Sequence, residues 1–183
     1  MSFIDVLDAE IAEHPAHRNE FFAQAKARSW SRSQIAVFGP EYYHFTRLFP
    51  RSLAALVARV ENERTRAALA SVLCSELGGE RYDEAHFLLF RSALNGAGVT
   101  EVEISRAPRF AATLSLTRGI DNLFREDPLA RALGAEYALE AQADTMIAGI
   151  RRGFQQSKEN GGSIAFFKVH AVEEPVHKEK AKS

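Results

Sequence analysis

The stretch Leu53-Ala-Ala-Leu-Val-Ala-Arg-Val60 decides the fold class of this chain. Its larger apolar side chains recur at i, i+3, i+4 and i+7, which is the spacing of one buried face of an α-helix. These side chains are Leu53, Leu56, Val57 and Val60. The same period returns in segments 69–73 and 129–133. Amphipathic helices of this kind bury their apolar faces against one another, so the pattern predicts an all-α bundle.

Proline and glycine divide the chain into helices joined by short connections, which favour antiparallel neighbours. We expect helices over residues 3–13, 18–29, 32–48, 51–61, 63–77, 81–95, 108–124, 128–155 and 163–181. The run Val99–Ile104 alternates between apolar and polar residues, but one short strand cannot form a sheet. We therefore predict an extended loop for that run.

Length and composition indicate an ordinary globular protein. The chain has 183 residues, of which 46% are hydrophobic and 26% charged, so we expect a single domain over residues 1–183. The net charge is −1 and shows no basic excess for a nucleic acid. The sequence has neither an apolar run long enough for a membrane helix nor a signal-peptide core, and we expect a cytoplasmic protein.

Three glutamates occupy positions where the helical stripes require an apolar side chain. The stripe through Leu69 and Val72 continues to Glu76, and the stripe through residues 129–133 continues to Glu136 and Glu140. A single glutamate of this kind more often lies at a helix end with its carboxylate in solvent. A buried carboxylate costs several kcal/mol unless it is protonated, paired or bound to a metal. Their occurrence on two separate helices favours a bound cation.

Histidines complete this pattern. In His170-Ala-Val-Glu-Glu-Pro-Val-His177, the residues His170, Glu174 and His177 have the spacing of one helical face. His86 adds a third imidazole near the start of another predicted helix. Imidazole and carboxylate together suit iron, manganese or zinc, so the sequence predicts a metal site, large enough for two ions, between helices of the bundle.

Three segments resemble the haem-oxygenase-like diiron oxidases, which share a fold with pyrroloquinoline-quinone synthase and thiaminase II. They are Glu41–Leu53 (EYYHFTRLFPRSL), Glu76–Gly79 followed by Glu84–Arg91 (EAHFLLFR), and Phe166–His170 (FFKVH). The similarity extends over about residues 30–180. It implies a bundle of about seven core helices.

The resemblance also implies a ligand set for two iron ions per chain, with manganese as the alternative metal. Carried over to this sequence, the ligands are Glu76, His86, Glu136, His170, Glu174 and His177. His86 and His177 would serve one iron, His170 and Glu174 the other, and Glu76 and Glu136 would bridge or cap them. Glu140 is expected as a neighbouring partner or replacement ligand. Tyr43, His44 and Arg47 are expected to line a substrate pocket, although aromatic residues in such a run are more often simply core.

This sequence departs from the family pattern near its end. Glu174 stands where the family has aspartate, and Pro175 should kink the helix that carries it. The chain also ends soon after His177, whereas family members continue with a further closing helix. Either the protein is a short variant or the chain is truncated, and both alternatives leave this helix less covered.

The resemblance implies a non-haem diiron oxidase or oxygenase that activates O2 to oxidise a small organic substrate. Its expected partners are O2 and that substrate, with a homodimer as one possible assembly, and neither nucleic acid nor membrane. The alternatives are a metal-free enzyme of the quinone-synthase or thiaminase II type, a small-molecule binding protein of the same fold, or a helical module without a site. Thiaminase II requires a nucleophilic cysteine, and we interpret Cys74, the single cysteine, as a small core residue instead.

Overall fold

The computed structural model describes residues 2–16, 18, 20–155 and 165–170, and every regular element in this part of the chain is helical. The all-α prediction is therefore confirmed. The helices are α1 (Phe3–Glu13), α2 (Glu20–Ala27), α3 (Arg32–Arg59), α4 (Glu63–Glu76), the 3₁₀ turn η1 (Tyr82–Glu84), α5 (His86–Gly96), α6 (Glu101–Arg106), α7 (Ala111–Arg125) and α8 (Leu129–Gly153). Residues 165–170 are also helical. Among the described helices, none is long and apolar enough to cross a membrane.

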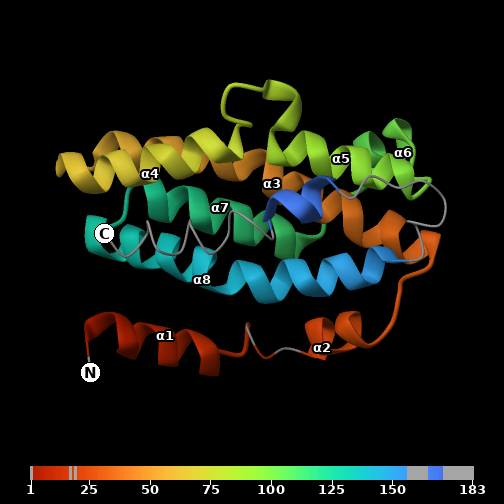
Figure 1. The fold of residues 1–183 in the computed structure, drawn as a ribbon, viewed down its shortest axis with the longest axis horizontal. Coiled ribbons are helices and arrows are strands. Elements are labelled where there is room, and N and C mark those ends of the chain that lie inside the picture. Colours follow the sequence, from red (N-terminus) through yellow and green to blue (C-terminus); the bar gives the residue numbers. More distant parts are fainter. Residues whose placement is uncertain (1, 17, 19, 156–164, 171–183) are drawn as a thin grey trace.

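Helix α3 is the central element, and it contacts α4, α5, α6, α7 and α8. Helices α1 and α2 pack along α8, on its side away from α4 and α5 (Figure 1). The segment 165–170 lies near the middle of the bundle, beside α8 and α5 in this view (Figure 1). Residues that are far apart in the sequence therefore meet around the middle of α3.

Two groups of buried side chains fill the interior. One is rich in aromatic residues and joins α3 and α5 to the C-terminal end of α8 and to segment 165–170; Tyr42, Phe90 and Phe166 belong to it. The other is mainly aliphatic and joins α3 to α4, α7 and α8; Leu53 and Leu56, both 0% exposed, belong to it. Phe45 on α3 packs against both groups, so the two cores meet along this helix.

The structure corrects two expected elements. Residues 32–48 and 51–61 form the single helix α3, with Pro40 and Pro50 inside it. An interior proline costs a helix about 3 kcal/mol, but here the helix continues because its buried face is unbroken from Phe49 to Leu56. The run Val99–Ile104 is not an extended loop but contains the start of α6. The capping box between Thr100 and Glu103 nucleates this short helix.

Gly39 allows α3 and α5 to approach each other closely. A Cβ atom added there would lie 2.1 Å from Cδ2 of Leu94, which is itself 0% exposed and packed in the core. We expect Gly39→Ala to lower the free energy of unfolding by about 1–3 kcal/mol because it overpacks this contact. Urea unfolding monitored by circular dichroism measures the change.

Gly119 on α7 provides the matched control. It is exposed, and a Cβ added there meets no atom within 4 Å. Gly119→Ala should raise the free energy of unfolding by about 0.5–1 kcal/mol, because alanine stabilises a helix interior relative to glycine. Equal effects of the two substitutions would contradict the close approach of α3 and α5.

Candidate metal centre

Glu76, His86 and His170 come together from three different helical segments. Glu76 is the last residue of α4, and His86 is the first residue of α5. The connection between them turns at Gly78, which has φ of 89°, and a Cβ there would lie 2.3 Å from the carbonyl oxygen of Arg81. Only glycine fits this turn, and the turn returns the chain so that the two side chains meet.

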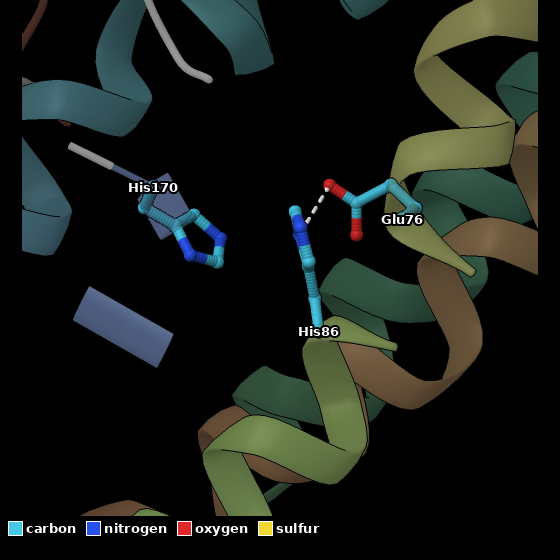
Figure 2. Close-up of side chains that lie close together, drawn as sticks. All are labelled: Glu76, His86 and His170. Carbon is cyan, nitrogen blue, oxygen red and sulfur yellow. Dashed lines mark ion pairs between the residues drawn. The ribbon is translucent and has the colours of Figure 1, made fainter. Parts of the chain in front are cut away.

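The three side chains are buried and lie within bonding reach of a common point. They are 8%, 1% and 5% exposed for Glu76, His86 and His170, and one ligand atom of each lies within 4.8 Å of the others. Nδ1 of His86 lies 3.1 Å from Oε1 of Glu76, and the rings of His86 and His170 have centroids 4.3 Å apart. Figure 2 shows the His86 ring between the Glu76 carboxylate and the His170 ring. We call these residues the Glu76–His86–His170 cluster.

A backbone hydrogen bond orients His170. Its Nδ1 lies 2.8 Å from the carbonyl oxygen of Phe166, one turn earlier in the same helical segment. A carbonyl can only accept, so Nδ1 carries the proton and the lone pair of the ring is on Nε2. Histidines that bind metals commonly hold their second ring nitrogen in this way.

Helix α8 adds two buried carboxylates on the face that it turns inward. Glu136 is 1% exposed and Glu140, one turn later, is 6% exposed. Glu140 lines the same cavity as Glu76 and His170. Carboxylates at this depth are costly unless a positive charge or a proton accompanies them.

The donor set fits iron. Two imidazoles and one carboxylate from the Glu76–His86–His170 cluster form the combination that non-haem Fe(II) sites use when positions remain open for O2 or substrate. The buried carboxylates of α8, on Glu136 and Glu140, are of the type that a second ion of this kind requires, and Glu140 lines the same cavity as Glu76 and His170. The residues present can therefore hold iron.

A cavity of about 250 Å³ adjoins the cluster. Glu76, Glu140 and His170 form part of its wall, and the rest is largely apolar. The side chains of Phe38, Tyr42, Phe45, Phe49, Leu139, Met146 and Ile147 line this remaining surface. The cavity lies where the two cores meet along α3, and it provides space for a small molecule beside the candidate ligands.

A family model described as iron-containing redox enzyme matches residues 38–183. The chain belongs to this family. The chain is also similar to several named synthases. The 4-aminobenzoate synthase of Chlamydia pneumoniae is 26% identical over 99% of this chain and 80% of its own length. The 4-aminobenzoate synthase of Chlamydia trachomatis is 25% identical over 100% of this chain and 79% of its own. The 4-chloro-allylglycine synthase of Streptantibioticus cattleyicolor is 23% identical over 96% of this chain and 67% of its own.

The same fold occurs in a solved structure. A CADD-like protein of unknown function from Nostoc punctiforme superposes with a TM-score of 0.80 at 20% identity, over 98% of this chain and 80% of that one. Together with the family match, this confirms the family resemblance stated from the sequence. Iron is the metal that membership of the iron-containing redox enzymes implies for this chain.

The structure describes four of the six predicted ligands. It brings Glu76, His86 and His170 together and buries Glu136 on the neighbouring α8. Glu174 and His177 lie outside the described residues. The ligand role of all six, and that of Glu140, stays a prediction. In this iron-containing redox enzyme, Glu140 rather than Glu136 reaches the wall of the cavity.

The predicted pocket residues have neighbours on the same helix that do line the cavity. Tyr43 and His44 are buried and Arg47 is exposed, but none of the three lines the cavity. The residues of α3 that line it are Phe38, Glu41, Tyr42, Phe45, Thr46 and Phe49. A helix turns one side of a run of aromatic residues to the cavity, and composition alone does not show which side. Contact of Tyr43, His44 and Arg47 with a substrate stays a prediction.

The interpretation of Cys74 as a core residue is wrong. Its thiol is exposed, because a position two residues before the inward-facing Glu76 lies on another face of α4.

Sequence reasoning missed Glu41. This carboxylate is 7% exposed, lines the cavity, and accepts hydrogen bonds at 3.1 and 3.2 Å from the backbone N–H of Phe110. It lies three residues after Phe38 and four before Phe45, so it occupies a stripe position as Glu76 does. The test that found Glu76, continuing an apolar stripe until a polar residue interrupts it, would also have found Glu41 on α3.

His44 makes the stability of the protein depend on pH. Burial lowers the pKa of His44, and the positive charges of Arg109 and Arg47 lower it further, whereas the nearby Glu41 raises it. The folded state thus favours neutral imidazole, while the unfolded chain takes up a proton below pH 6.5. This contribution to stability is present above pH 6.5 and is lost as the pH falls through the lowered folded-state pKa.

We therefore expect the free energy of unfolding to decrease between about pH 7.5 and about pH 5.5, and to decrease less in His44→Gln, which cannot titrate. Urea unfolding of both proteins at the two pH values measures the difference. The expectation is refuted if wild type and variant lose the same free energy.

Proposed function

We propose that this protein is a non-haem diiron oxidase or oxygenase, which uses O2 to oxidise a small organic substrate. The observation that supports the proposal is the convergence of two histidines and a carboxylate beside an apolar cavity. The Glu76–His86–His170 cluster would provide ligands to the iron, together with Glu136 or Glu140 from α8. Glu174 and His177 would complete the set that the family resemblance implies.

Bound Fe(II) supplies the electrons that reduce O2, which is otherwise slow to react with organic molecules. The chain itself contributes orientation. The Phe166 carbonyl fixes the ring of His170, and the Gly78 turn fixes Glu76 relative to His86. Ligands that are already positioned need little rearrangement when iron and substrate bind.

The largely apolar wall of the cavity would limit the access of water to the reaction. Its aromatic and aliphatic side chains surround the space next to His170 and Glu140. A dry site prevents side reactions of a strong oxidant and strengthens the electrostatic interactions that hold the substrate. The cavity would thus bind the substrate and keep water away from the site where the substrate is oxidised.

Iron content tests the ligand assignment. After identical anaerobic loading with Fe(II), wild type should hold about two irons per chain, whereas His86→Ala and His170→Ala should each hold about one or none. Each substitution removes an imidazole ligand. We expect the same loss for His177→Ala. Inductively coupled plasma mass spectrometry after removal of excess metal gives the stoichiometry, and oxygen consumption should fall with it.

His44→Ala is the matched control, because it also removes a buried histidine but one outside the cluster. It should keep the iron content of wild type. Equal iron in wild type, His86→Ala and His170→Ala would exclude the ligand assignment and favour a metal-free enzyme or a small-molecule binding protein of the same fold.

Metal binding should also stabilise the fold. Iron neutralises carboxylates that otherwise face one another in the interior, and a ligand that binds only the folded state raises the melting temperature with its concentration. We expect Fe(II) or Mn(II) to raise the melting temperature of wild type progressively and that of His86→Ala much less. Differential scanning fluorimetry measures both. A melting temperature that does not respond to millimolar metal would argue against the site.

A further inference from the structure

The charged groups on the cavity wall are of one sign. Three carboxylates line it, from Glu41, Glu76 and Glu140, and the lining residues within the described part of the chain include no lysine or arginine. Such a wall repels an anionic molecule and attracts a cationic one. If the proposed function holds, iron takes up the charge of Glu76 and of ligands near it. Glu41 is not part of the ligand set, so its carboxylate is free of the iron and faces the cavity.

The surroundings of Glu41 leave its charge without a cationic side chain. Both its oxygens accept hydrogen bonds from the backbone N–H of Phe110, at 3.1 and 3.2 Å. Among the described residues, no lysine, arginine or histidine forms a direct ion pair with Glu41, and the nearby His44, whose pKa is lowered by burial, favours its neutral form. A carboxylate that is 7% exposed and faces an apolar cavity gains most from a cationic partner that enters the cavity.

We propose that Glu41 binds the ammonium group of the substrate, and that the substrate class is small amines with an apolar body. This inference rests on the proposed function, because the bound amine is a substrate only if the protein is an oxidase or oxygenase. Glu41 and His170 line the same cavity, so an amine held by Glu41 has its carbon skeleton in the space that adjoins the candidate iron ligands.

The size and the lining of the cavity agree with such a substrate. A dry cavity of about 150 Å³ accommodates benzene, so the volume here, about 250 Å³, suits a molecule of about ten non-hydrogen atoms. Phe38, Tyr42 and Phe45, which are close to Glu41 in the sequence of α3, line the same cavity. Aromatic faces attract ammonium groups and also pack against apolar chains, so they suit both parts of an amine.

Glu41 also has a structural role, which the test must separate. Phe110 is the residue before the first turn of α7, and its N–H is held by Glu41. Glu41→Gln keeps a carbonyl oxygen that accepts this hydrogen bond and removes the negative charge. A purely structural Glu41 would therefore tolerate the change with little effect on ligand preference.

The experiment compares three probes with the same phenyl group and different heads: 2-phenylethylamine, which is an ammonium ion at neutral pH, 2-phenylethanol, and phenylacetate. Isothermal titration calorimetry measures their binding to the full chain, both iron-free and after anaerobic loading with Fe(II). Wild type should bind the ammonium at least about tenfold more tightly than the alcohol and more tightly still than the carboxylate, because a hydrogen bond to a charged group is involved. Glu41→Gln should lose this preference and keep its affinity for the alcohol.

Equal or tighter binding of the alcohol or of phenylacetate to iron-free wild type would overturn the inference, and so would an unchanged ammonium preference in Glu41→Gln. If Glu41→Gln does not fold, Ala143→Leu replaces it. This variant fills the cavity and leaves Glu41 in place, so it should weaken binding of the ammonium and the alcohol alike. Unchanged ammonium binding would place that probe elsewhere and overturn the inference. Binding to the iron-free protein tests the role of Glu41 alone. The iron content tests the proposed function, so the failure of one can be told from the failure of the other.

Discussion

The burial of ionisable side chains in an apolar bundle is the constraint on which the rest of this structure depends. Glu76, His86, Glu136, Glu140 and His170 are each less than a tenth exposed. Each would cost several kcal/mol in isolation, and Glu76, His86 and His170 lie close enough to one another to hold a metal ion. The tight turn at Gly78 brings Glu76 to His86, and the two cores that meet along α3 surround the cavity that Glu76, Glu140 and His170 line.

The sequence predicts most of this centre because helical periodicity shows which side of a helix faces inward. Glu76 interrupts a stripe of leucine and valine, and a polar residue at such a position is conspicuous. Glu41 interrupts the stripe of Phe38 and Phe45 in the same way, and the same test applied to α3 identifies it. Helix α6 was missed because its Thr100 capping box determines local structure more strongly than the alternating pattern does. Continuity of α3 through Pro50 depends on packing with helices distant in the sequence.

Fold and chemistry are supported by different observations in this protein. The CADD-like structure, at 20% identity, shows the arrangement of the helices. Membership of the iron-containing redox enzymes rests on the match over residues 38–183. The selection of a substrate depends on neither of these, but on the few side chains that line the cavity. Relatives of one family can therefore keep the ligand positions and differ in what they oxidise.

The hydrogen bonds between Glu41 and the Phe110 amide connect the cavity to the start of α7. The amide proton of Phe110 is therefore a natural spectroscopic probe of the cavity. Its NMR chemical shift and its rate of exchange with solvent respond to the charge on the Glu41 carboxylate, whatever changes that charge. Because Phe110 is itself half exposed at the surface, the state of a buried compartment can be followed from a position outside it.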